Sequence, residues 1–299
     1  MAETEDKKKH DKNADPVWMS LLAGAMAGAL AKTTIAPLDR TKINFQISNT
    51  RYTLMGAVSF IIHSYKNEGF LSLWRGNSAT MARIIPYAAI QFSAHEQWKR
   101  VLGVDNQNQP DDPLRRYIAG AMAGVTSQSL TYPLDLARAR MAVTQKQQYS
   151  SLKEVFVHMM HNEGPKAYFR GYVPTVIGVI PYAGTSFFTY GTLKRWHKDN
   201  KYPKSALFNL VSGGISGMVA QTTSYPLDIV RRRMQTAAVT GSDHKYRSII
   251  ATIVVIYREE GIKGGFFKGL SMNWIKGPIA VGISFATYDY ALEMLRGLP

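Results

Sequence analysis

The chain has 299 residues, 45% of them hydrophobic, and contains no cysteine. Without cysteine, a disulfide framework, a zinc site with thiolate ligands and a thiol nucleophile are all excluded. The formal net charge of +15 indicates an anionic partner, for which nucleic acid, anionic lipid and a phosphate-bearing small molecule all qualify.

The chain begins with a polar stretch. Residues 1–16 mix acidic and basic side chains with almost nothing apolar. They lack both the apolar core of a secretory signal and the acid-poor amphipathic pattern of a transit peptide. We therefore expect a short disordered tail, with any organelle address inside the folded body.

A pattern that recurs three times organises the rest of the chain. The tripeptide Pro-Leu-Asp begins at Pro37, Pro133 and Pro226, at intervals of roughly a hundred residues. An acid–glycine pair and an aromatic–base–glycine triplet follow each copy in the same order. These landmarks predict three tandem repeats, over residues 17–102, 113–198 and 204–299. Linkers rich in proline, asparagine and charge separate them, at residues 103–113 and 198–204.

Each repeat contains two long segments with few charges, separated by a polar stretch. Residues 171–193 and 205–227 carry no charged side chain, and a helix needs about 20 residues to cross the hydrocarbon core. We expect these two segments to satisfy a hydropathy test. The other four contain a charge or many small and polar residues, so one face of each must avoid lipid: residues 17–38, 77–96, 116–134 and 270–292.

The polar stretch between the two segments of a repeat also has a pattern. In residues 53–67 and 150–162, apolar side chains recur at helical spacing, as in a short amphipathic helix on a membrane surface. The predicted fold is therefore an all-α membrane protein. It has six transmembrane helices in three tandem two-helix repeats with pseudo-threefold symmetry, and short amphipathic helices between the spans.

A Pro-x-Asp-x-x-base motif ends the first span of each repeat. The proline is expected to kink the helix and draw its end toward a common axis. One such pair is usually an ordinary contact on a solvated helix, but three copies at membrane depth favour a gate. Three converging helices allow a ring of ion pairs that closes one mouth of a pore: Asp39 with Arg138, Asp135 with Arg231, and Asp228 with Lys42.

Residues that break the threefold symmetry indicate substrate contacts, because an asymmetric ligand needs unequal side chains. Five residues before the three prolines stand Lys32, Gln128 and Gln221, and the second spans carry Arg83, Gly178 and Lys276 at equivalent positions. An arginine offers a planar fork to phosphate, and lysines act as point charges. Lys32, Arg83 and Lys276 can together bind phosphate groups, whereas the alternative is snorkelling cations without a ligand.

With these motifs, the sequence resembles the mitochondrial carrier family over all three repeats. The resemblance implies that the ring of ion pairs is the matrix-side gate and that Gln46 and Gln235 brace it, with Ala142 in the third such position. It also implies that Arg83, Lys276 and the pair Gly178–Val179 are substrate contact points, the glycine pair being typical of members that carry adenine nucleotides. Asn44 departs from the pattern, since a second base is usual there.

The family has a second, cytosolic gate with the motif aromatic-acid-x-x-base, which is incomplete here. The second spans supply Glu96, Lys99, Lys194 and Asp289 to it. Glu96 can meet Lys194 and Asp289 can meet Lys99, but the third position has no charges. Because each exposed pair contributes about 0.2–1 kcal/mol, we expect the cytosolic gate to be the weaker one. A resting carrier would then favour the cytosol-open state.

Longer tracts such as LSLWRGNSATM and KGPIAVGISF are similar to the coenzyme A transporter branch of the family. The similarity implies exchange of coenzyme A, dephospho-coenzyme A or adenosine 3′,5′-diphosphate for adenine nucleotides such as ADP. The expected mechanism is alternating access in the inner mitochondrial membrane, by a monomer that binds cardiolipin.

Two alternatives stay open. An ATP-magnesium/phosphate carrier would have similar contact residues, although residues 1–16 contain no EF-hand loop. A soluble nucleic-acid-binding protein would explain the charge but would not need two long uncharged segments. Neither an enzyme nor a metal or cofactor site is expected. No nucleophile–base pair or glycine-rich phosphate loop is apparent, and the only histidines with metal-ligand spacing are His158 and His161, on a predicted amphipathic helix.

Overall fold

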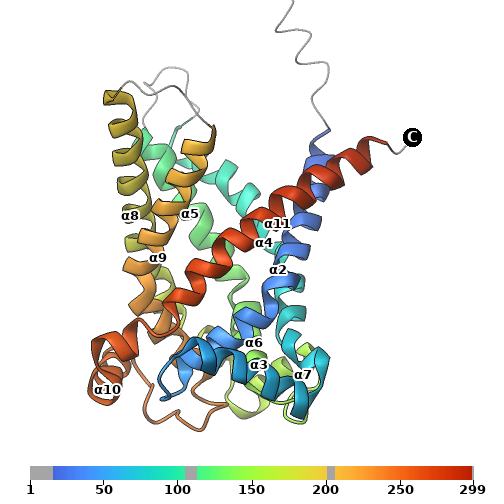
Figure 1. Ribbon diagram of the computed structural model, residues 1–299, viewed down its shortest axis with the longest axis vertical. Coiled ribbons are helices and arrows are strands. Elements are labelled where there is room, and N and C mark those ends of the chain that lie inside the picture. The colour runs from blue at the N-terminus through green and yellow to red at the C-terminus, as the bar shows by residue number, and fades with distance from the viewer. Residues whose placement is uncertain (1–15, 105–112, 201–205, 298–299) are drawn as a thin grey trace, which may run out of the picture.

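The computed structural model describes residues 16–104, 113–200 and 206–297 (Figure 1). Nearly all of the predicted tail and most of both predicted linkers lie outside these residues. The first repeat contains α2 (Val17–Ile47), α3 (Leu54–Glu68), η1 (Phe70–Trp74) and α4 (Asn77–Val101). The second contains α5 (Pro113–Leu130), α6 (Tyr132–Val143), α7 (Leu152–Asn162), η2 (Pro165–Phe169) and α8 (Tyr172–Asp199). The third contains α9 (Ala206–Thr236), α10 (Ile249–Gly261), η3 (Ile262–Phe266) and α11 (Leu270–Arg296).

The repeats form a closed ring. The second span of each repeat packs along the first span of the next, α4 against α5, α8 against α9, and α11 against α2 (Figure 1). The three first spans also contact one another, because α2, α6 and α9 meet in pairs. This arrangement is the pseudo-threefold bundle that the repeats predict.

The short helices α3, α7 and α10 gather at one end of the bundle. The start of α2 and the end of α11 lie at the opposite end (Figure 1). Each short helix begins with a hydroxyl cap, in which Thr53, Ser151 and Ser248 accept a hydrogen bond from a backbone N–H three residues later. The first two short helices agree closely with the prediction from residues 53–67 and 150–162.

The prediction that the two uncharged segments satisfy a hydropathy test was wrong, because a segment without charges need not have a high mean hydropathy. Among the described residues, only α2 is both long and apolar enough to pass a test of length and mean hydropathy. The uncharged segments in α8 and α9 do not pass, because their many glycine, serine, threonine and tyrosine residues lower the mean. Such residues suit helices that pack closely against neighbours rather than face lipid on all sides.

The prolines act differently in the three first spans. Pro37 and Pro226 lie inside the continuous helices α2 and α9. In the second repeat the helix stops instead at Thr131, with α5 before it and α6 after it. The predicted kink is therefore a full interruption in that repeat, as expected where a proline ring clashes with the preceding turn.

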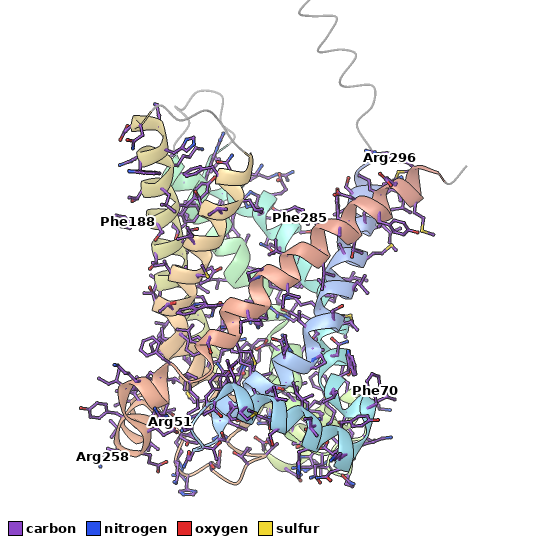
Figure 2. All side chains as sticks on the ribbon, in the orientation of Figure 1. Arg51, Phe70, Phe188, Arg258, Phe285 and Arg296 are labelled. Atoms are coloured by element: carbon purple, nitrogen blue, oxygen red, sulfur yellow. The ribbon has the colours of Figure 1, made fainter. Side chains whose placement is uncertain are left out.

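Side chains along the spans form an apolar band. Phe188 on α8 and Phe285 on α11 are 76% and 60% exposed, and they lie between the two ends of the bundle (Figure 2). Arg51 and Arg258 lie at the short-helix end, and Arg296 lies at the other (Figure 2). Large exposed apolar surfaces are rare on soluble monomers, so this distribution suits a chain whose sides face lipid.

Candidate functional site

Two buried ion pairs join neighbouring repeats near the short-helix end. Arg138 of the second repeat binds Asp39 of the first, and Arg231 of the third repeat binds Asp135 of the second. The two aspartates are only 6% and 2% exposed. Each pair connects the ends of two first spans, as the Pro-x-Asp-x-x-base spacing predicts.

The third predicted pair is not formed, which corrects the expectation of a complete ring. In the part of the chain that the structure describes, no ion pair within 4.0 Å joins Asp228 to Lys42. Asp228 Oδ2 accepts a hydrogen bond from Gln221 Nε2 at 3.0 Å instead. Lys42 Nζ lies 5.2 Å from the centre of the Tyr225 ring, a cation–π distance. Each partner thus has another contact on α9.

Two of the predicted substrate-contact cations bind these same carboxylates. Lys276 Nζ lies 2.6 Å from Asp39 Oδ1, and Arg83 Nη1 lies 3.7 Å from Asp135 Oδ1. Gly178 occupies the equivalent position in the second repeat and supplies no charge to Asp228. Gly178 is thus the uncharged member of the three contact points, and Asp228, the acid nearest to it by symmetry, is the one that receives no cation from a contact point.

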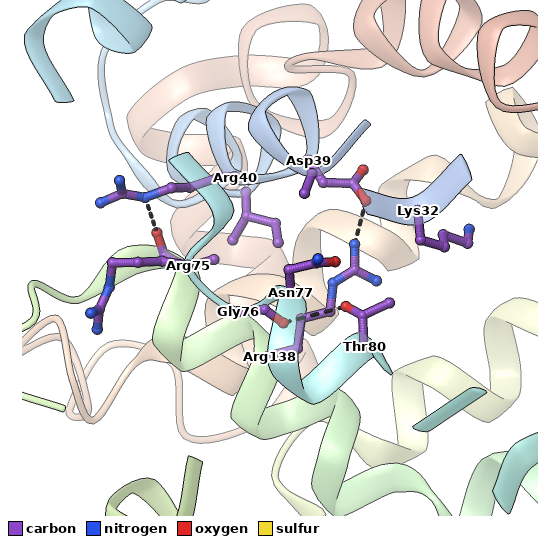
Figure 3. A pocket seen from close by; sticks show the side chains of 11 residues that line it. Lys32, Asp39, Arg40, Arg75, Gly76, Asn77, Thr80 and Arg138 are labelled. Atoms are coloured by element: carbon purple, nitrogen blue, oxygen red, sulfur yellow. Dashed lines mark hydrogen bonds and ion pairs between the residues drawn. The ribbon is translucent and has the colours of Figure 1, made fainter. Parts of the chain in front are cut away.

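Lys32 lies beside the first pair. It lines a crevice with Asp39, Arg138, Asn77 and Thr80, and Figure 3 shows its side chain extending past the pair. Within the described residues, no carboxylate lies within salt-bridge distance of Lys32. Of the three predicted contact cations, Lys32 is the one for which no salt bridge is seen among the described residues, although Asp39 lines the same crevice.

The neighbouring Gly178–Val179 pair sits on α8 against α9. A Cβ atom at Gly178 would lie 3.6 Å from the Leu227 Cβ atom, which is an ordinary contact. Packing therefore does not require glycine at this position. Val179 is partly exposed.

Of the two predicted brace glutamines, only Gln235 contacts a gate carboxylate. Its Nε2 donates to Asp135 Oδ2 at 3.0 Å and to the Tyr132 hydroxyl at 2.9 Å. Gln46 Nε2 donates instead to the Tyr225 hydroxyl at 3.2 Å. This difference matches the ion pairs, because Tyr225 belongs to the corner where no pair forms.

A second set of buried charges joins the spans to the short helices. Arg140 donates from Nε to the Gln235 carbonyl at 3.1 Å and from Nη2 to Glu163 Oε2 at 2.8 Å. Arg233 makes the same two contacts in the third repeat, with the Gln46 carbonyl and Glu260. Each arginine thus links its own repeat's acid–glycine pair to the first span of the next repeat.

Lys268 of the third aromatic–base–glycine triplet also binds Glu260. Burial lowers the pKa of the Lys268 ammonium, and the bond to Glu260 offsets part of that effect. The glutamate is therefore shared between two bases, one from the first span and one from the segment that precedes the second span.

The first repeat makes the same link with a different residue, which sequence reasoning missed. Asn44 stands where Arg140 and Arg233 stand in the other repeats. Arg40, one helical turn earlier, donates from Nε to the Ala142 carbonyl at 3.2 Å and from Nη2 to Glu68 Oε2 at 2.9 Å. Asn44 Nδ2 also donates to the Ala142 carbonyl, at 2.9 Å. The available signal was the (i, i+4) spacing, which puts both side chains on one helix face.

We expect Arg40→Ala to destabilise the folded protein by about 3 kcal/mol, the low end for a broken buried pair because Glu68 stays partly exposed. The unfolding temperature in detergent should fall. Adding Asn44→Arg should restore much of the loss, because arginine at the equivalent position makes both contacts in the other repeats. A double variant no more stable than Arg40→Ala would contradict this interpretation.

The second spans begin on glycines that touch the first spans. Gly76 and Gly171 have φ values of +87° and +78°, in the left-handed region that favours glycine. A Cβ atom at Gly76 would lie 2.8 Å from the Arg138 carbonyl oxygen. A Cβ atom at Gly171 would lie 3.1 Å from the Arg231 carbonyl oxygen. Where the first repeat meets the second and the second meets the third, the backbone at the start of the second span therefore packs directly against the backbone of the next first span.

The predicted cytosolic gate residues lie toward the other end of the second spans. Lys99 Nζ lies 3.1 Å from Glu96 Oε1 of its own helix. Among the described residues, no ion pair links Glu96 to Lys194 or Asp289 to Lys99. Pairs between repeats are therefore seen at the short-helix end, and the second gate stays a prediction.

Comparison with known proteins identifies one family along all three repeats. The model of the family described as mitochondrial carrier protein matches residues 13–106, 109–201 and 202–298. The mitochondrial coenzyme A transporter of Xenopus laevis is 56% identical over 291 residues, which cover 96% of this chain and 88% of the relative. The protein of that name from Rattus norvegicus is 57% identical over 290 residues, which cover 96% and 91%. Solute carrier family 25 member 16 of Bos taurus is 40% identical over 297 residues, which cover 92% and 88%.

Proposed function

The chain belongs to the mitochondrial carrier family, and from that premise we propose that it exchanges coenzyme A for adenine nucleotides such as ADP by alternating access. Dephospho-coenzyme A and adenosine 3′,5′-diphosphate are included among its substrates. It is a multi-pass protein of the inner mitochondrial membrane. Members of this family are transporters rather than enzymes.

The observation that carries the proposal is the pairing of the contact cations with gate carboxylates. Lys276 and Arg83 lie within salt-bridge distance of Asp39 and Asp135 in the structure. A phosphate group competes with a carboxylate for the same cation, because both are oxygen anions that accept charge-assisted hydrogen bonds. Binding of a nucleotide would therefore weaken two corners of the closed end. A ligand shifts such an equilibrium only by its different affinity for the two states.

We propose that the short-helix end faces the matrix and that the structure is the cytosol-open state. The ion pairs between first spans support this assignment, since they close that end. Lys32 would be the first cation that a phosphate meets, because among the described residues no carboxylate lies within salt-bridge distance of it. Arg83 and Lys276 would follow as they leave their aspartates.

We further propose a monomer with bound cardiolipin. The support for the lipid comes from the N-termini of α4, α8 and α11, where Gly76, Gly171 and Gly269 provide no side-chain cap. Free backbone N–H groups at a helix N-terminus attract phosphate. Native mass spectrometry of protein purified in mild detergent would test both the lipid and the monomeric state.

Uptake into liposomes tests the function directly. The purified protein should exchange internal ADP for external coenzyme A, dephospho-coenzyme A or adenosine 3′,5′-diphosphate. An ATP-magnesium/phosphate carrier would prefer ATP and phosphate in the same panel. Uptake of phosphate and ATP without uptake of coenzyme A would overturn the proposal.

A further inference from the structure

The Arg83 side chain is held in place on several sides. It crosses from α4 to the junction of α5 and α6, where Nη2 donates to Gln128 Oε1 at 2.6 Å and Nε donates to Thr131 Oγ1 at 3.2 Å. The guanidinium also lies 4.7 Å from the centre of the Tyr87 ring. These contacts use the Nε hydrogen and one Nη2 hydrogen. The second Nη2 hydrogen and the Nη1 hydrogens, which face Asp135 at 3.7 Å, are left for a ligand.

The contact with Arg83 fixes the orientation of the Gln128 amide. An arginine can only donate hydrogen bonds, so the atom that faces Arg83 must be the amide oxygen. The other end of the amide, Nε2, must then be the donor. Nε2 is buried and has no hydrogen-bond partner. A buried donor without an acceptor is unfavourable and calls for an explanation such as a missing ligand.

The position of Gln128 in the repeat supports a ligand role. It stands five residues before Pro133, as Lys32 and Gln221 stand before the other two prolines. Gln221 uses its Nε2 on the Asp228 carboxylate. Gln128 uses its Oε1 on a cation and keeps Nε2 unused. Two glutamines at equivalent positions thus bind groups of opposite charge, Gln128 a guanidinium and Gln221 a carboxylate.

On the basis of the proposed transport of nucleotides, we propose that Gln128 is a further substrate-recognition residue. It fixes the Arg83 fork through Oε1 and donates from Nε2 to the phosphate group that Arg83 binds. The Gln128 amide and the Arg83 guanidinium are hydrogen-bonded neighbours, so one phosphate can bind both when it replaces Asp135 at Arg83 and the bond between Arg83 and Gln128 is kept. The ligand class is a phosphate ester, because only an acceptor of high negative charge displaces the Asp135 carboxylate.

The test compares Gln128→Met with Gln221→Met in liposomes. Methionine keeps the length of glutamine and removes both the donor and the acceptor. Gln128→Met should raise the KM for coenzyme A by about tenfold, the loss of one charge-assisted contact, with Vmax changed by less than about twofold. Gln221→Met should change Vmax rather than KM, because its partner is a gate carboxylate.

A charge variant separates recognition from packing. Gln128→Glu keeps the shape but puts a carboxylate against Arg83, so KM should rise further than in Gln128→Met while the unfolding temperature without substrate does not fall. An unchanged KM in Gln128→Met overturns the inference. So does a fall in Vmax that is matched by a fall in unfolding temperature, since that pattern is purely structural. If the parent itself takes up no coenzyme A, the proposed function fails instead, and the same variants are then measured with the phosphate ester that the parent does transport.

Discussion

Lys276→Ala and Arg83→Ala should each reduce nucleotide exchange in liposomes by about ten- to a hundredfold. Each variant removes a charge-assisted contact to phosphate worth about 1.5–3 kcal/mol. Each also leaves a gate carboxylate with one cation fewer, because Lys276 contacts Asp39 and Arg83 faces Asp135. Initial rates of coenzyme A uptake against internal ADP measure the effect.

Conservative changes provide the control. Lys276→Arg and Arg83→Lys keep the charge and should retain more activity than the alanine variants, with Arg83→Lys the weaker because it loses the planar fork. Lys263→Ala, at an exposed position of η3, should transport like the parent. Near-normal uptake by both alanine variants, with a normal unfolding temperature, would mean that the phosphate binds elsewhere.

Gly178→Trp should abolish exchange of substrates that contain adenine. The proposed reason is that a glycine leaves room for a flat base beside α8, and an indole fills that space. Gly178→Ala is the matched control, because its methyl group would make only an ordinary contact with Leu227 at 3.6 Å. Uptake of coenzyme A and ADP by both variants measures the difference. If coenzyme A uptake survives in Gly178→Trp, the base lies elsewhere in the cavity.

The repeats and their order could be predicted from the sequence because both are periodic. A motif that recurs in one order fixes three equivalent units, and the Pro-x-Asp-x-x-base spacing then places Asp39 opposite Arg138. The short helices followed from helical spacing of apolar residues. The family match confirms the three repeats, and the fold is the one expected.

Two failures share a physical cause, which is that equivalent positions in the sequence need not have equivalent partners in space. Repeat spacing pairs Lys42 with Asp228, but the Tyr225 ring and Gln221 offer each of them a contact that no spacing rule reveals. Asn44 lacks the charge usual at its position, although the Arg40 guanidinium one turn earlier makes the same two contacts. The third failure has a different cause, because hydropathy depends on small polar side chains as well as on charge.

The three glycines that begin the second spans differ in how much variation they can tolerate, although their motif is the same. All three have positive φ values, so any other residue pays a similar backbone penalty at each. Sterically they are unequal. A Cβ atom would lie 2.8 Å from a carbonyl oxygen at Gly76, and 3.1 Å from both a carbonyl oxygen and the Tyr132 hydroxyl at Gly171. At Gly269 the nearest atom is the Tyr225 hydroxyl oxygen, at 3.4 Å.

Two of the three contacts between neighbouring repeats therefore include close packing of backbone on backbone, and the third does not. The third is the contact between α9 and α2, where Asp228 and Lys42 do not form an ion pair. Natural and engineered variants at Gly269 should be milder than those at the other two glycines. At Gly76, by contrast, a Cβ atom would lie 2.8 Å from the Arg138 carbonyl oxygen, so Gly76→Ala should weaken the contact between the first and second repeats.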